Sequence, residues 1–173
     1  MLPYGRQSIS EDDIQAVVDV LRGDWLTTGP AVAAFEARLG EVAGGHRAIT
    51  ATSGTAALHM AYGAAGVTRG DTVISTPMTF IATTAMASVL GANIVFADVE
   101  EDTALIDPDA VDALVDERTK VIAAVDYAGH PADYDRLSAA AARVDALVLD
   151  DAAHSIGSTY KGRPVGDLSL IHI

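Results

Sequence analysis

Hydrophobic residues recur along the chain in two alternating patterns, short apolar runs and longer stretches with helical periodicity. The short runs occupy residues 48–52, 72–76, 93–98, 121–126 and 146–150, and they predict strands that are apolar on both faces. The helical stretches occupy residues 55–65, 79–90, 108–117 and 133–142. Repeated β-α units of this length predict an α/β fold with one mainly parallel sheet and helices on both of its faces.

Two further helices are predicted before the first of these strands. Ser10 precedes three acidic residues and an apolar stripe, which is the pattern of an N-capped helix, and Gly23 ends it. Pro30 suits the first turn of the second helix. Near the other end of the sequence, residues 160–163 predict a turn between two short strands.

Composition narrows the class of protein. The 173 residues are half hydrophobic, but no apolar run is long enough to cross a membrane. The first six residues lack the apolar segment of a secretory signal, so we expect a cytoplasmic protein. The sequence contains no cysteine, which excludes a disulfide framework and any thiolate site.

The net charge of −13, from 11 basic and 24 acidic residues, narrows the class of partner. A charge of this sign repels phosphate backbones and anionic lipids, so we expect neither nucleic acid nor a membrane as a partner. An anionic ligand would have to be held by local groups such as the N-terminus of a helix.

Ligands of parallel α/β sheets bind at the carboxyl ends of the strands, and three segments there carry candidate chemistry. Ser53-Gly54-Thr55 lies between an expected strand and an expected helix, where backbone amides and two hydroxyls could bind an anion. The tripeptide alone favours the simpler interpretation, a helix N-cap. Phe80 begins an expected helix and could stack on a planar ligand or belong to the core.

The third segment, Asp150-Asp151 with His154 three residues later, carries the strongest local signal. Adjacent carboxylates at a buried strand end repel each other and lose hydration, so at least one of them needs a partner. Three interpretations remain open: an aspartate that caps the next turn, a metal site that lacks a third ligand, and a carboxylate that faces a protonated heteroaromatic nitrogen. Lys120 and Lys161 are the only lysines, and neither is expected near this edge.

Several segments, in this order and spacing, resemble the DegT/DnrJ/EryC1/StrS family of sugar aminotransferases. The matching segments are Pro3-Tyr4-Gly5-Arg6-Gln7, Trp25-Leu26-Thr27-Thr28-Gly29-Pro30, Phe35-Glu36, Thr52-Ser53-Gly54-Thr55-Ala56-Ala57-Leu58-His59, Pro77-Met78-Thr79-Phe80, Asp150-Asp151-Ala152-Ala153-His154 and Tyr160-Lys161-Gly162-Arg163-Pro164-Val165-Gly166. The resemblance implies the large-domain portion of fold type I of the pyridoxal-phosphate-dependent transferases, with pyridoxal 5'-phosphate as cofactor.

The resemblance also implies roles for individual residues. Gly54 and Thr55, with Ser53, would hold the cofactor phosphate. Phe80 would stack on the pyridine ring. Asp151 would pair with the ring nitrogen, so that the ring accepts electrons from the reacting carbon. His154 would lie near the ring, and Tyr4 and Arg6 would lie near the substrate.

Within the family, residues 3–7 and 125–129 are most similar to the branch that serves pseudaminic-acid and polysaccharide biosynthesis. That branch transfers an amino group from glutamate to the C4 keto group of a UDP-linked 4-keto-6-deoxy-N-acetyl sugar. Since members of the family form dimers, the resemblance also implies a homodimer for the full-length protein. A non-catalytic module that binds a nucleotide sugar or a cofactor is the alternative.

The resemblance covers less than half of a full family member. It implies that residues 1–30 form an N-terminal arm and helix, and that residues 31–173 form an incomplete cofactor-binding domain. The family's Schiff-base lysine lies beyond Ile173, so we expect the 173-residue chain to be inactive on its own.

Overall fold

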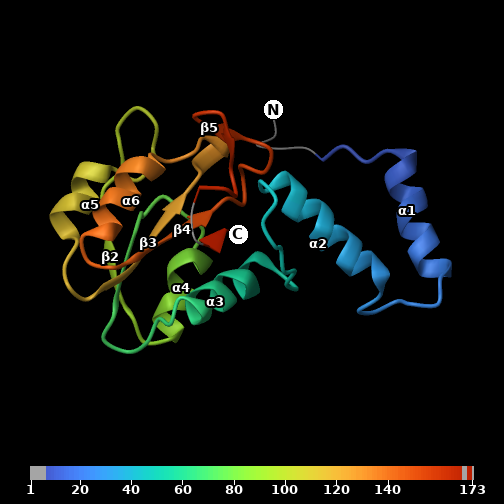
Figure 1. The fold of residues 1–173 in the computed structure, drawn as a ribbon, viewed down its shortest axis with the longest axis horizontal. Coiled ribbons are helices and arrows are strands. Elements are labelled where there is room, and N and C mark those ends of the chain that lie inside the picture. The colour runs from blue at the N-terminus through green and yellow to red at the C-terminus, as the bar shows by residue number, and fades with distance from the viewer. Residues whose placement is uncertain (1–6, 169–170, 173) are drawn as a thin grey trace.

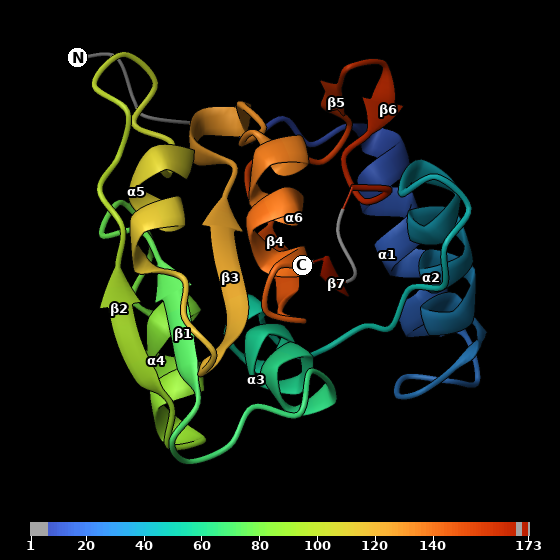
Figure 2. The same cartoon turned by 60° about the vertical axis from the view of Figure 1, so that its left-hand side comes forward.

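The fold is built on a five-stranded parallel sheet in the order β2-β1-β3-β4-β7 (Figure 2). The computed structural model describes residues 7–168 and 171–172. The strands are β1 (Thr72–Ser75), β2 (Asn93–Phe96), β3 (Thr119–Val125), β4 (Leu147–Asp151) and β7 (Ile171–His172). Four of the five strands expected from the sequence are therefore confirmed, and so is the α/β class.

Helices cover both faces of the sheet, as the apolar strands predict (Figure 2). The helices α3 (Gly54–Ala64) and α4 (Ala82–Val89) pack on one face, and α5 (Pro108–Leu114) and α6 (Tyr134–Ala142) pack on the other. Successive strand residues serve the two cores in turn: Val73 packs toward α3 and α4, and Ile74 packs toward α5 and α6.

The register brings the ends of β3 and β4 to the same level. Ala124 pairs with Asp150, and Val125 pairs with Asp151. A short 3₁₀ turn, η1 (Tyr127–Gly129), follows β3 directly. The residues that leave these two neighbouring strands therefore meet at one edge of the sheet.

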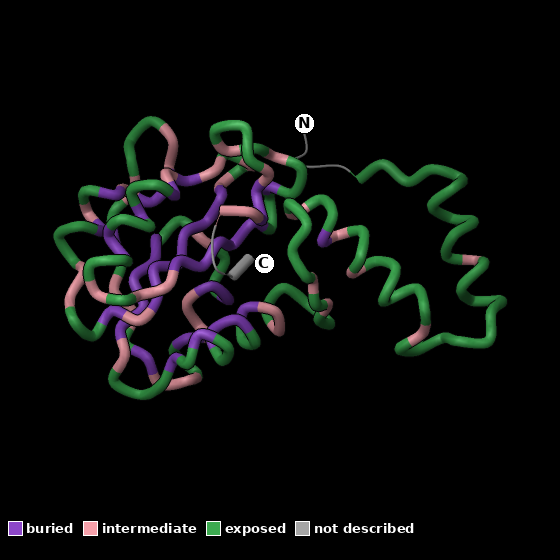
Figure 3. The backbone as a smooth tube through the Cα atoms, viewed as in Figure 1, coloured by how far each residue is buried: buried purple, intermediate pink, exposed green. Residues whose placement is uncertain are grey.

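The first two helices, α1 (Glu11–Arg22) and α2 (Pro30–Val42), lie apart from the sheet (Figure 1). Ser10 caps α1 through a reciprocal capping box with Asp13, as its sequence predicts. None of the residues of α1 is buried (Figure 3). Burial of an apolar face therefore does not hold this helix in place within the described chain.

The segment after α2 differs from expectation. Residues 46–52 belong to no helix or strand, and Ile49 is 78% exposed. The predicted strand at 48–52 is therefore wrong for the described chain, because local preference for extended backbone makes a strand only beside a partner strand. The Glu36 carboxylate of α2 anchors the segment by accepting hydrogen bonds from the Thr50 N–H at 2.8 Å and the Thr50 hydroxyl at 2.9 Å.

Two helix boundaries differ from those expected from the sequence. The helix expected over 79–90 begins at Ala82, so Phe80 lies in the connection before it. The helix expected over 108–117 ends at Leu114. The turn expected over 160–163 is confirmed between β5 (Thr159–Tyr160) and β6 (Arg163–Pro164), where Lys161 and Gly162 have φ values of 50° and 82°.

Among the described residues, no helix combines the length and apolar character that crossing a bilayer requires.

Candidate active site

The two adjacent aspartates at the end of β4 face opposite sides of the sheet. Asp150 is fully buried on the side of α6, where its charge acts on Asp126 and on the Tyr134 hydroxyl. Asp151 is 7% exposed and lies on the side of α3 and α4. Because consecutive side chains of a strand point to opposite faces, the strand itself separates the two acids.

A chain of hydroxyl groups holds Asp151. The Thr83 hydroxyl of α4 donates to Asp151 Oδ2 at 2.7 Å, and the Ala153 N–H donates to Asp151 Oδ1 at 3.4 Å. The Thr79 and Thr83 hydroxyls are 2.7 Å apart. The carboxylate is therefore oriented by neighbours on two other segments, and its contact with Ala153 also gives it the turn-capping role considered from the sequence.

A tyrosine of α3 completes this cluster. The Tyr62 hydroxyl donates to the Thr83 carbonyl at 2.5 Å, and its ring is fully buried. Burial, and then the negative charge of Asp151, raise the pKa of Tyr62 well above its ordinary value. Asp151 thus lies where a charge is poorly screened by solvent.

Phe80 lies in the connection between β1 and α4, directly after Thr79. Its side chain is 73% exposed, so it is not a core residue. Its neighbour Thr79 joins the hydroxyl chain that leads to Asp151 through Thr83. The connection between β1 and α4 therefore carries an exposed aromatic ring next to a segment that contacts the buried carboxylate.

Ser53 caps α3, as the simpler interpretation of the sequence predicted. Its Oγ accepts a hydrogen bond from the Ala56 N–H at 3.2 Å. Ser53, Gly54 and Thr55 are all exposed, and a Cβ built on Gly54 meets no atom within 4 Å. The first amides of a helix have no acceptor inside the helix, so this terminus can also receive an anion.

In the described part of the chain, the helix α3 connects Ser53-Gly54-Thr55 to the Asp151 cluster. Tyr62 of the same helix reaches Thr83. Within residues 7–168, no recorded hydrogen bond joins the tripeptide directly to Asp151 or Phe80.

His154 lies on the loop that follows Asp151 and is exposed. Its ring centre is 6.4 Å from that of Tyr127, which follows β3, and the two planes make an angle of 60°. Thus the ends of two neighbouring strands bring these rings together. In the described part of the chain, no group of three or more metal-binding side chains comes together.

Four candidates remain, Tyr4, Arg6 and the two lysines. Tyr4 and Arg6 lie outside the described residues. Lys120 is the second residue of β3, at the edge opposite to Asp151. Lys161 is in the β5–β6 turn and pairs with Asp135, and this contact raises the pKa of the lysine. Both lysines are therefore away from the cluster, as expected.

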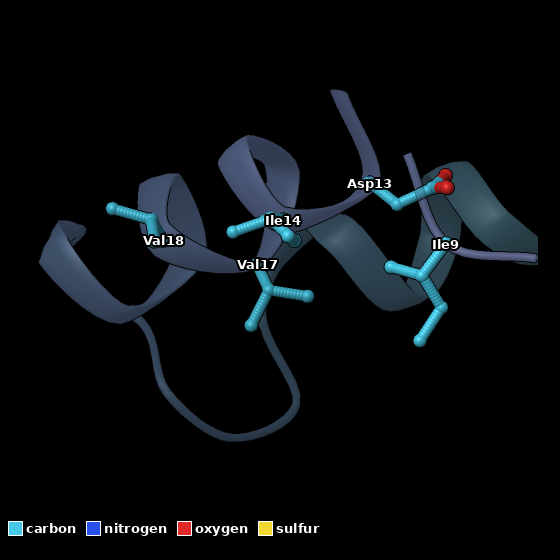
Figure 4. Close-up of a pocket in the computed structure, with 5 residues that line it drawn as sticks. All are labelled: Ile9, Asp13, Ile14, Val17 and Val18. Carbon is cyan, nitrogen blue, oxygen red and sulfur yellow. The ribbon is translucent and has the colours of Figure 1, made fainter. Parts of the chain in front are cut away.

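Sequence reasoning missed the supporting hydroxyls, Thr79, Thr83 and Tyr62. Thr79 and Thr83 are four residues apart, the spacing of one helical turn, and this was the available signal. An apolar hollow on α1, lined by Ile9, Asp13, Ile14, Val17 and Val18, contains none of the candidate site residues (Figure 4).

Solved structures share this fold. An aminotransferase from Psychrobacter cryohalolentis is 37% identical over 98% of this chain, with a TM-score of 0.92. A Streptococcus pneumoniae protein named as a sugar aminotransferase, Spr1654, in a PLP form, is 34% identical over 97% of this chain, with a TM-score of 0.91. Helicobacter pylori PseC, described as an aminotransferase of pseudoaminic acid biosynthesis, is 31% identical over 98% of this chain, with a TM-score of 0.91.

The chain spans about half the length of these structures: 44% of the Psychrobacter chain, 47% of Spr1654 and 46% of PseC. Residues 7–173 match the profile of the DegT/DnrJ/EryC1/StrS aminotransferase family. The match extends over α1, the whole sheet and the β5–β6 hairpin, so it includes every described candidate site residue. The chain belongs to the DegT/DnrJ/EryC1/StrS aminotransferase family.

Proposed function

We propose that the protein of which this chain is a part is a pyridoxal-phosphate-dependent sugar aminotransferase. The observation that carries the proposal is Asp151, a buried carboxylate that Thr83 orients at the carboxyl edge of a parallel sheet. Support comes from the family and from a 34%-identical structure solved in a PLP form.

The described residues fit pyridoxal phosphate in three respects. The exposed N-terminus of α3, with Ser53, Gly54 and Thr55, suits a phosphate, and the open space beside Gly54 leaves room for one. The exposed ring of Phe80 suits stacking on a planar ring. Asp151 suits a protonated ring nitrogen, because an opposite charge nearby favours the protonated form.

When bound, the cofactor supplies a conjugated ring that accepts the electron pair released when the donor loses its α-proton. In this proposal Asp151 holds a proton on the ring nitrogen, and Thr83 keeps the carboxylate turned toward it. Phe80 fixes the plane of the ring, and the amides and hydroxyls of residues 53–55 fix its phosphate. His154 lies beside the ring, and Tyr4 and Arg6 bind the substrate, with Arg6 as the cation for a diphosphate or a donor carboxylate.

We further propose that the acceptor is a UDP-linked 4-keto-6-deoxy-N-acetyl sugar, aminated at C4, and that glutamate is the donor. The similarity of residues 3–7 and 125–129 to the pseudaminic-acid branch, and the 31% identity to PseC, support this choice. We propose a cytoplasmic homodimer. The exposed apolar side chains of α1, which include Val17 and Leu21, support a partner surface there.

The proposed organisation has two parts, an arm of residues 1–30 and a cofactor-binding domain from residue 31 onward. The second part is completed by chain beyond residue 173. The link that supports this division is Glu36, which ties α2 to the segment before the phosphate site through Thr50.

The test uses the full-length protein with pyridoxal phosphate, ¹⁵N-glutamate and the UDP-linked keto sugar. We expect 2-oxoglutarate and a sugar that carries the ¹⁵N label, detected by mass spectrometry. A dTDP-linked keto sugar forms the second arm and tests the choice of nucleotide. Cofactor or sugar binding without any transfer of label would instead favour the non-catalytic binding module.

A further inference from the structure

Asp126, the residue after β3, is fully buried and has no role in the proposed chemistry. Its Oδ1 accepts hydrogen bonds from the Ala132 N–H at 3.0 Å and the Tyr134 hydroxyl at 2.7 Å. Its Oδ2 accepts one from the Ser155 hydroxyl at 2.7 Å. One carboxylate therefore joins the end of β3, the start of α6 and the loop that follows β4.

The loop held in this way is the one that carries the candidate site. Ser155 directly follows His154 and comes four residues after Asp151. The Ser155 N–H donates to the Ala152 carbonyl at 2.9 Å, and the Ser158 N–H donates to the Ser155 carbonyl at 2.8 Å. Ser155 is thus the centre of two successive turns, and its hydroxyl is the group that fastens them to the sheet edge.

A second set of contacts also joins the segment after β3 to the loop after β4. The Ser158 hydroxyl donates to the Gly129 carbonyl at 3.0 Å. Gly129 has a φ of 84°, and a Cβ at this position would lie 3.1 Å from the His154 carbonyl oxygen. The Asp126 N–H also donates to the Asp151 carbonyl at 3.2 Å. The segment after β3 and the loop after β4 therefore pack against each other closely along their length.

We infer that Asp126 is a positioning residue: through the Ser155 hydroxyl it fixes the loop that carries Asp151 and His154 against the end of β3. This inference rests on the proposed function, because it gives the two residues a ligand to be positioned for. Buried charge-assisted hydrogen bonds are short and directional, which suits a group whose task is to hold a loop in one arrangement.

A matched pair of variants separates positioning from simple stability. Ser155→Ala and Tyr134→Phe each remove a 2.7 Å hydrogen bond from a buried hydroxyl to Asp126, and Tyr134→Phe also removes the interaction of that hydroxyl with Asp150. Only Ser155→Ala removes the hydrogen bond that holds the loop after β4. In the full-length protein we expect Tyr134→Phe to lower the melting temperature at least as much as Ser155→Ala. The dissociation constant for pyridoxal phosphate should rise roughly tenfold for Ser155→Ala, as for other residues that orient a ligand-binding group, and less than about twofold for Tyr134→Phe.

Two readouts do not require turnover. Amide hydrogen exchange of residues 152–158 should accelerate in Ser155→Ala and stay unchanged in Tyr134→Phe. The absorbance of bound pyridoxal phosphate, followed against pH, should shift only in Ser155→Ala. Asp126→Asn offers a conservative rescue, because an amide can accept the same two hydrogen bonds at Oδ1 and donate to the Ser155 hydroxyl. We expect its cofactor affinity to stay within about threefold of wild type.

Equal effects of Ser155→Ala and Tyr134→Phe on affinity and exchange would overturn the inference and leave Asp126 with a structural role. Wild-type protein that binds no pyridoxal phosphate would instead overturn the proposed function, and this inference with it. If Ser155→Ala does not fold, Ser155→Cys replaces the hydroxyl by a weaker donor, and we expect the same changes in affinity and exchange at smaller size; unchanged affinity and exchange in a folded Ser155→Cys would count against the inference.

Discussion

The two faces of the sheet treat neighbouring carboxylates differently. On the α3–α4 face, Asp151 accepts a hydrogen bond from Thr83, whose hydroxyl also contacts that of Thr79, the neighbour of the exposed Phe80. On the α5–α6 face, Asp150 and Asp126 are both fully buried, and their charges act on each other. We infer from this difference that the carboxylates on the α5–α6 face have a structural role, and that Asp151, on the α3–α4 face, is the one available to a ligand.

The sharpest way to break this comparison is to neutralise each acid of β4 in turn. Asp151→Asn keeps the shape and removes the charge, so we expect a loss on the order of 3 kcal/mol in transition-state stabilisation, or about a hundredfold in rate. Asp150→Asn should cost far less, since it faces away from the proposed ring. The rates are measured in the full-length protein with excess cofactor. If Asp150→Asn lost most of its activity while Asp151→Asn stayed near the wild-type rate, the roles assigned to the two aspartates would be wrong.

A smaller effect is expected from the hydroxyl chain itself. Thr83→Val keeps the shape of the side chain and removes its hydrogen bonds to Asp151 and Thr79, which should lower the free energy of unfolding by about 1–3 kcal/mol. Thr84→Val is the matched control, because the one hydrogen bond of the Thr84 hydroxyl within the described residues goes to the Ile81 carbonyl, at 3.4 Å. Urea unfolding measures both. Equal losses from the two variants would mean that Thr83 does not orient Asp151.

On the α5–α6 face, burial of Asp126 should make the free energy of unfolding depend on pH. Burial, and then the charge of Asp150, raise the pKa of Asp126 above 3.8. The folded state therefore binds this proton more tightly than the unfolded state, and the associated stability is lost as pH rises from about 4 through the raised pKa. Asp126→Asn has no such proton, so its stability relative to wild type should increase with pH over this range.

Glu36 supplies the control of opposite sign. Hydrogen bonds from the Thr50 N–H and then from its hydroxyl lower the pKa of Glu36. Its contribution is present above the unfolded pKa and is lost as pH falls through the lowered value. Stability relative to wild type in Glu36→Gln should therefore decrease as pH rises. Unfolding in urea at several pH values between 3 and 7 tests both slopes, and two slopes of the same sign would contradict the assignments.

No effect at all is expected from the two lysines of this chain. Lys120 lies at the edge opposite to Asp151, and Lys161 is held by Asp135. Borohydride treatment of the full-length protein with pyridoxal phosphate should label neither, and Lys161→Gln should retain wild-type turnover. Stoichiometric label on Lys161, found by peptide mass spectrometry, would show that the reactive lysine belongs to this part of the chain.

Local pattern alone was sufficient for much of the fold. The Ser10 cap, the turn at residues 160–163 and four of the five strands lie where periodicity and turn chemistry placed them. These features depend on neighbours in sequence: a hydroxyl three residues before an amide, a residue that tolerates positive φ, and a run of apolar side chains. The same reasoning failed at residues 48–52, where a strand also needs a partner that local pattern cannot supply.

The sequence by itself determined that Asp150 and Asp151 end a buried strand at the edge where ligands bind. It also indicated that at least one of the two carboxylates needs a partner. Only the tertiary structure decided which acid meets the hydroxyls of Thr83 and Thr79 and which meets Asp126 and Tyr134. The physical reason is that the packing of α3, α4 and α6 chooses the neighbours of each side chain. Of these helices, α3 and α4 come from parts of the chain far from β4, whereas α6 directly precedes it.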